Sequence, residues 1–250
     1  GFETSKFNNL IVKEIKKKDT NIEIKLEKIK IKLDLPNFQL FLSTKKIEFM
    51  YQNIKIPLTD IKIYSKINKI FNFKAEVNRI IFRIEKFRTQ DVQQIAVRIK
   101  PSNFKTYLLN NINGGEIEKA LFDLKIDKDF KLIDYKANGT IKKIEAKILS
   151  DLTIKDISFN FIIDKNLTLV NSINANYEGF SVSNGSIDLQ REKEIEIKGK
   201  FNSRFKLEDV KLNKLFTKVK FFQENKIEAQ GSLLHVFNLK INNNFKIIDY

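Results

Sequence analysis

The chain has 250 residues, and its 46 Lys and Arg residues exceed its 31 Asp and Glu residues, which gives a net charge of +15. It contains no Cys and one His, so a cysteine nucleophile, a disulfide framework and a Cys-based zinc site are excluded. The 8 Gly residues are too few to favour a phosphate-binding loop, while 42% hydrophobic and 31% charged residues are typical of a chain that buries a core.

The positive charge would ordinarily indicate nucleic acid or an anionic membrane surface as a partner. Only six of the basic residues are Arg, which is the residue that recognises phosphates and base edges through its planar fork. The heavy use of Lys, Asn, Ile and Phe is also what an AT-rich coding sequence produces. We therefore predict no nucleic-acid partner.

Period-two alternation of apolar and polar residues is the main structural signal along the chain. One face of each run carries Ile, Leu, Phe or Val, and the other carries Lys, Glu, Asp, Asn or Ser. This pattern predicts antiparallel strands with one solvated face. In chain order the runs lie at 22–26, 29–33, 54–58, 73–77, 97–99, 141–148, 157–163, 195–197 and 227–229.

Three segments have helical spacing instead, and we predict a short amphipathic helix in each. The first is Ser5 to Lys18, and the second is Thr59 to Phe71, which Pro57 precedes. The third runs from Ser102 to Asn113, with Ser102 as its cap and Gly114-Gly115 as its stop. No apolar run exceeds three residues, so the sequence predicts no transmembrane helix and no signal-peptide core.

An internal repeat lies in the second half of the chain. Residues 121–135 and 236–250 are identical at nine of fifteen positions, and residues 159–169 form a weaker copy. Each copy reads as a strand, a tight turn rich in Asp and Asn, and a second strand. We therefore predict a sheet that grows by added hairpins, with a strand block and amphipathic helices in residues 1–115 and a repeated hairpin block of the same sheet in residues 116–250.

The segment from Pro101 to Leu124 resembles the AsmA-like envelope proteins, especially the large YhdP-type members. It contains the pair Tyr107-Leu108, then Asn111-Ile112, the pair Gly114-Gly115, Ile117 and a strand that begins at Ala120. Tyr107 stands where those proteins more often carry Trp. The resemblance implies a fragment of a protein in the periplasm of the Gram-negative envelope, held in the inner membrane by an anchor outside this fragment.

The resemblance also implies a long, curved antiparallel β-sheet, shaped as an apolar groove, that guides phospholipid between the inner and outer membranes. Such a groove holds acyl chains through burial of apolar surface, at about 0.8 kcal/mol per methylene, and needs no catalytic group or cofactor. We predict that the groove lining comes from the inward side chains of the repeated hairpins: Phe122, Leu124, Ile126, Phe159, Phe161, Ile163, Phe237, Leu239 and Ile241.

The same alternation is compatible with a sheet that folds on itself as a sandwich and buries its apolar face. That reading gives a structural or adhesive protein of the cell surface without a ligand. A third reading, a nucleic-acid binder, would require a contiguous positive face with exposed aromatic side chains.

No residues point to an enzyme or a metal site. His235 lies between Leu233 and Phe237 in an apolar phase, where a packed or edge role is expected. The carboxylates Asp123, Asp127, Asp129 and Asp134 lack the Gly and the closing Glu of a calcium loop, so we predict turn and surface roles for them. The cluster of Lys13 and Lys16 to Lys18 fits a solvated helix end, with contact to anionic headgroups as the alternative.

Overall fold

The structure is a computed structural model. It describes residues 8, 12–13, 15–16, 20–27, 29–37, 39–44, 46–65, 77–97, 106, 109–129, 131–149, 152–177, 179–192, 194–207, 228–242 and 247–249. The described chain is mainly β, and its large sheet is antiparallel, as the alternation predicted. The sheet is open, which the alternation left undecided.

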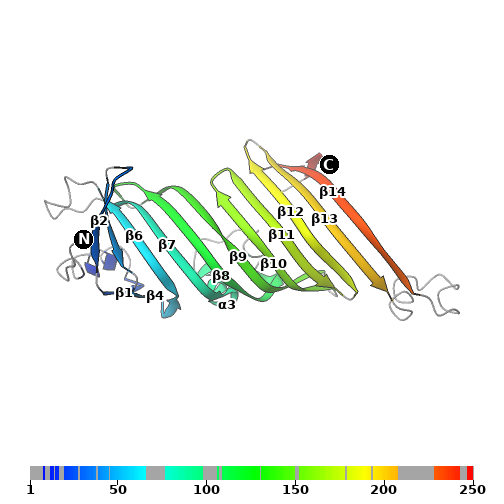
Figure 1. Ribbon diagram of the computed structural model, residues 1–250, viewed down its shortest axis with the longest axis horizontal. Coiled ribbons are helices and arrows are strands. Elements are labelled where there is room, and N and C mark those ends of the chain that lie inside the picture. Colours follow the sequence, from blue (N-terminus) through cyan, green and yellow to red (C-terminus); the bar gives the residue numbers. More distant parts are fainter. Residues whose placement is uncertain are drawn as a thin grey trace. The chain divides into compact units, whose positions relative to one another are not determined.

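Strands make up most of the described chain (Figure 1). Those before the helix α3 (Thr89–Val97) are β1 (Ile22–Glu27), β2 (Lys30–Asp34), β3 (Gln39–Thr44), β4 (Lys46–Tyr51), β5 (Ile54–Ile56), β6 (Leu58–Ser65) and β7 (Val77–Arg88). Those after it are β8 (Ile112–Ile126), β9 (Leu132–Leu149), β10 (Leu152–Asp164), β11 (Leu167–Tyr177), β12 (Phe180–Arg191), β13 (Ile195–Leu207), β14 (Ala229–Ile241) and β15 (Ile247–Asp249).

The larger sheet has twelve strands in the order β15-β14-β13-β12-β11-β10-β9-β8-β7-β6-β3-β2, and β1, β4 and β5 form a separate three-stranded sheet. From β6 onward, strands that are consecutive in the chain are neighbours in the sheet, which is the order that added hairpins produce. The chain divides into two compact units. The first holds residues 1–110, 115–141 and 162–165, and the second holds residues 111–114, 142–161 and 166–250.

A two-layer core stabilises the first unit. Ile24, Leu26, Ile29 and Leu42 form its buried cluster. Half-buried apolar side chains pack against that cluster from both sheets and from the N-terminal helical residues: Val12, Ile15, Ile31, Ile47, Phe49 and Ile63. The apolar face of the large sheet is therefore covered in this region.

One predicted helix is a strand. Residues 58–65 of the segment predicted as the helix Thr59–Phe71 form β6, which pairs with β3 and β7, while residues 66–71 lie outside the described residues. Ile61 and Ile63 alternate with Lys62 and Tyr64, and β-branched side chains favour the pleated sheet. Tyr64 does not join a helical apolar face but stacks on Phe41 of β3, with ring centroids 5.1 Å apart.

Val97, the first residue of the strand run predicted at 97–99, is instead the last residue of the helix α3, so that prediction was wrong for Val97, while residues 98–99 lie outside the described residues. The start of α3 is stabilised by Asp91, which lies in the first turn and forms an ion pair with Arg88 at 2.9 Å. The Thr89 hydroxyl donates to the Gly115 carbonyl of β8 at 3.1 Å, a contact between segments that periodicity cannot detect.

The helix predicted over Ser5 to Lys18 is confirmed for its described residues, and the one predicted over Ser102 to Asn113 is correct only in part, because Ile112 and Asn113 belong to β8. Residues 8, 12–13 and 15–16 of the first segment and residues 106 and 109–111 of the third are helical. Gly114 and Gly115 do not stop that third helix, because β8 begins before them at Ile112. The Gly115 backbone has a φ of 123°, which is not the conformation of a regular strand and which residues with a side chain rarely adopt. Glycine is therefore favoured at this position within β8.

The repeat predicted from sequence recurs in the contacts. In the first copy Phe122 stacks on Phe82 of the preceding strand, and in the second Phe237 stacks on Phe201, with centroids 4.9 and 6.0 Å apart. The ion pairs of the hairpins recur as well: Lys125 with Asp134 at 2.9 Å, and Lys240 with Asp249 at 4.0 Å. Each copy also exposes two apolar residues after its turn, namely Leu132 and Ile133, and Ile247 and Ile248. The sequence repeat is therefore a structural repeat.

Candidate functional site

Register in the second unit separates apolar from charged side chains across β11 to β14. In antiparallel strands, directly paired residues point to the same face. The pairs Ile195–Ile241, Ile197–Leu239 and Gly199–Phe237 therefore share one face, and the pairs Glu196–Lys240 and Lys198–Asn238 share the other. Bulges at Ser172 and Asn184, with φ of 54° and 52°, keep β11 and β12 in phase with this division.

We call this surface the apolar face. It consists of Thr168, Val170, Ile173, Ala175 and Tyr177 of β11, Phe180, Val182, Gly185, Ile187, Leu189 and Arg191 of β12, Ile195, Ile197, Gly199, Phe201, Ser203 and Phe205 of β13, and Ala229, Gly231, Leu233, His235, Phe237, Leu239 and Ile241 of β14. The opposite surface, which we call the charged face, carries Asp188, Glu196, Lys198, Lys200, Arg204, Lys206 and Lys240.

Phenylalanine rings lie against glycines of neighbouring strands on the apolar face. Phe201 lies against Gly185, Phe237 against Gly199 and Phe205 against Gly231. A side chain at any of these glycines would overlap the ring, so glycine is what lets each ring approach the backbone. The rings thereby fill the gaps that the glycines leave and make the surface continuous.

No layer covers the apolar face among the described residues. Within the part of the chain that the structure describes, the extensive contacts of β11 to β14 are with neighbours in the sheet, whereas in the first unit β4 of the small sheet contacts β6 of the large one. Most apolar-face side chains of β13 and β14 are only half-buried, and Leu233 is 49% exposed. This is the arrangement expected of a surface that accepts an apolar ligand.

The predicted lining residues divide between the two units. Phe237, Leu239 and Ile241 lie on the apolar face, as their alternation predicted. Phe159 and Phe161 also belong to the second unit, where Phe161 is buried and Phe159 half-buried. The remaining four belong to the first unit: Phe122, Leu124, Ile126 and Ile163. In that unit Phe122 pairs with Phe82 and Leu124 with Ile80, on the face that the core cluster also uses.

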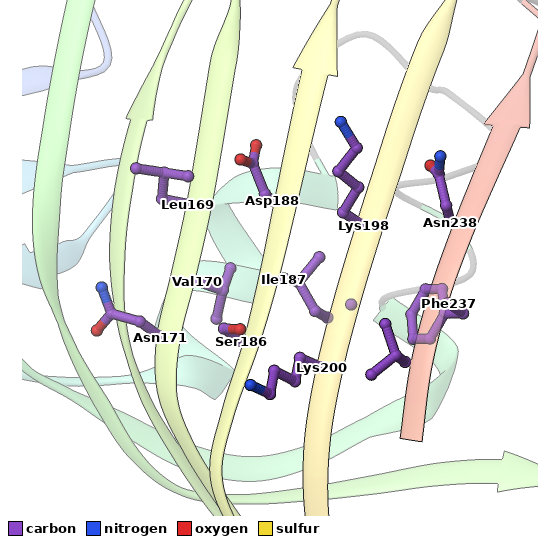
Figure 2. Close-up of a pocket in the computed structure, with 12 residues that line it drawn as sticks. Leu169, Val170, Asn171, Ser186, Ile187, Asp188, Lys198, Lys200, Phe237 and Asn238 are labelled. Atoms are coloured by element: carbon purple, nitrogen blue, oxygen red, sulfur yellow. The ribbon is translucent and has the colours of Figure 1, made fainter. Parts of the chain in front are cut away.

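An open depression of about 560 Å³ crosses the same four strands at the row of Val170, Ile187, Gly199 and Phe237 (Figure 2). The residues directly before and after each of these four in the chain also line the depression, among them Asp188, Lys198 and Lys200. The residues two positions away do not line it. Because side chains alternate between faces, the depression lies on the charged face. It is therefore separate from the apolar face.

The structure brings together two residues that sequence reasoning kept apart. The Ser203 hydroxyl lies 2.8 Å from His235 Nε2, across β13 and β14 on the apolar face. Ser203 is buried and His235 exposed, and the hydroxyl also donates to the Leu233 carbonyl at 3.5 Å, so the imidazole gives this buried hydroxyl its closer partner. The placement of His235 with Leu233 and Phe237 is confirmed by the register. The only signal for this contact in the sequence is that Ser203 follows Phe201 and precedes Phe205 at two-residue spacing, which places it on the same face of the strand as those apolar residues.

The described residues contain no group of three or more His, Cys, Asp or Glu side chains that could hold a metal ion. Asp127 acts in its turn, where its Oδ1 accepts hydrogen bonds from the backbone amides of Asp129 and Lys131, each at 2.8 Å. None of the helices in the described part of the chain is long and apolar enough to cross a membrane.

A comparison of the sequence with protein-family models gives no match, and comparisons with curated proteins and with solved structures give none either. The resemblance to AsmA-like envelope proteins therefore stays a prediction.

Proposed function

We propose that the chain binds the acyl chains of lipids on the apolar face of β11 to β14 and guides them along it. The observation that carries the proposal is an apolar surface across four strands over which no described element forms a second layer. Each acyl methylene that leaves water for such a surface contributes about 0.8 kcal/mol. Several methylenes lying along the strands would suffice for binding without any specific polar contact.

The proposed mechanism is passive. Side chains such as Ile197, Phe237 and Leu239 contact the acyl chain, and the polar end of the lipid stays near the solvent. The end strand β15 lies directly beside β14, which suits a surface that a ligand enters from the side. We extend the proposal to phospholipid in the periplasm of a Gram-negative envelope, with an inner-membrane anchor outside this fragment, on the resemblance of residues 101–124 alone.

A ligand-free structural or adhesive sandwich is the competing reading. It would require a second layer over the apolar face, so the two readings differ in whether that face is accessible. Native mass spectrometry of the purified chain tests this, together with uptake of a fluorescent fatty acid. Acyl-chain binding predicts co-purified lipid and saturable uptake. A folded, lipid-free chain that takes up no fatty acid would contradict the proposal.

Two neighbouring leucines of β14 provide a matched pair of variants. Leu233 lies on the apolar face and Leu234 on the charged face, and they are 49% and 60% exposed. Leu233→Asp should reduce fatty-acid uptake at least about tenfold, because it places a carboxylate on the ligand surface. Leu234→Asp should leave uptake unchanged. Circular dichroism of both variants establishes that they fold, and equal uptake by the two would contradict the assignment of the face.

A further inference from the structure

Arg191 stands out on the apolar face because it is the one permanently charged residue there among the described residues of β11 to β14. It ends β12 and pairs with Ile195 of β13, which fixes the side of the sheet to which its side chain points. The backbone amide of Arg191 donates to the Asn166 carbonyl at 2.7 Å, so the position is held within the sheet and does not belong to a loose turn.

The guanidinium of Arg191 is only partly satisfied. Its Nη2 donates to the Thr168 hydroxyl of β11 at 2.9 Å, a contact that again lies on the apolar face. Its Nη1 is buried and has no hydrogen-bond partner among the described residues. A buried guanidinium nitrogen without an acceptor costs free energy, and an oxyanion would supply the acceptor in a geometry that fits the planar fork.

Apolar side chains lead directly away from this charge. Leu189 and Ile187 follow along β12, and Ile195 and Ile197 lie beside them on β13. Ile187 and Arg191 are four residue steps apart along the extended strand, which corresponds to about 13 Å at the usual rise of a strand. A ligand with an anionic end at Arg191 would therefore have an apolar path for its chain.

We infer that Arg191 binds the anionic group of an amphiphile whose acyl chain lies along Leu189 and Ile187. The shared chemistry is an oxyanion, a carboxylate or a phosphate monoester, at the end of a linear chain. This inference rests on the proposed function, because it assumes that acyl chains use the apolar face. It adds that the face selects the charge of the headgroup and that the ligand lies in one direction.

The test compares oleate with oleyl alcohol, which share the chain and differ in the charged end, at physiological salt to screen the many surface lysines. The folded chain should bind oleate at least about tenfold more tightly than the alcohol, as charge-assisted hydrogen bonds predict. Arg191→Gln keeps a donor for Thr168 and should remove this preference, so that oleate and oleyl alcohol bind with similar affinity. Arg204→Gln, an exposed arginine on the charged face, should keep the preference.

The possible outcomes are distinguishable. Binding of both ligands with equal affinity, or a preference that survives in Arg191→Gln, would overturn the role of Arg191 and leave the proposed function standing. Failure of both ligands to bind would overturn the proposed function itself. The last measurement adds inorganic phosphate to the complex with oleate. If phosphate displaces oleate at comparable concentrations, Arg191 belongs to a site for free anions, and the proposal of an amphiphilic ligand would be overturned.

Discussion

The ring of Phe237 in β14 lies against the backbone of Gly199, its paired residue in β13, so closely that a Cβ at position 199 would overlap the ring. The same ring stacks on Phe201, with centroids 6.0 Å apart. Glycine at 199 is therefore a requirement of packing between side chain and backbone, and it fixes where the aromatic surface of the apolar face lies.

Gly199→Ala should displace the Phe237 ring. We expect a loss of about 1–3 kcal/mol in the free energy of unfolding, as for other substitutions that overfill a packed site. Fatty-acid uptake should fall as well, because the ring leaves the surface that contacts the chain. Urea denaturation and the uptake assay measure the two effects.

Gly114→Ala is the matched control, since its nearest neighbouring atom would be 4.0 Å from the new Cβ. It should leave stability and uptake close to those of the unchanged chain. Equal behaviour of the two variants would mean that the contact between Gly199 and Phe237 does not shape the surface.

Phe161 and Ile162 are adjacent in β10 but differ in exposure, at 7% and 47%. Phe161→Ala should lower the free energy of unfolding by about 3–5 kcal/mol, because a buried ring leaves a cavity. Ile162→Ala should change it by only about 0.5 kcal/mol. Denaturant titration of both variants tests this, and a small effect at Phe161 would indicate that its ring lines an accessible groove and is not part of a core.

Tyr64 should make the stability of the chain sensitive to alkaline pH. It is only 5% exposed, and burial raises the pKa of its phenol, with further contributions from nearby carboxylates such as Asp34. A group whose folded pKa is raised contributes stability that is complete below its unfolded pKa, about 10 for Tyr, and is lost as the pH rises through the folded pKa.

Tyr64→Phe removes that titration. We expect the free energy of unfolding of the unchanged chain to fall more steeply above pH 10 than that of the variant, and the ultraviolet absorbance of Tyr64 to titrate late. Parallel curves for the two proteins across this range would show that Tyr64 has no such role.

Asp127 organises the turn between β8 and β9 through its two backbone hydrogen bonds. Asp127→Ala should cost about 1 kcal/mol, the usual net value of a lost hydrogen bond. Asp127→Asn should cost less, since Asn242 occupies the equivalent position of the second repeat copy. Thermal unfolding of the two variants checks the order, and equal losses would mean that the carboxylate charge, and not its acceptor oxygen, is what the turn uses.

Sequence alone was sufficient where the signal is local. Alternation along residues 157–163 and 195–197 predicted strands and their apolar sides, because the two-residue period of a strand follows from backbone geometry. Asp and Asn in the repeated segment predicted a tight turn, as residues 127–131 show, because these residues tolerate the left-handed backbone that such a turn needs. The stacking of Phe122 on Phe82 and of Phe237 on Phe201 was not predicted, because Phe82 and Phe201 lie outside the repeat.

Tertiary structure decided whatever depends on partners that are distant in the chain. The apolar spacing of residues 58–65 is compatible with one face of a helix as well as with a strand. They form a strand because β3 and β7 supply hydrogen-bond partners for their backbone. The approach of Phe237 to Gly199 and the placement of Arg191 beside Thr168 arise from register between strands, which a single strand does not encode. Alternation marks an apolar face, and only packing determines that the first unit covers that face with a second layer while no described element does so in the second.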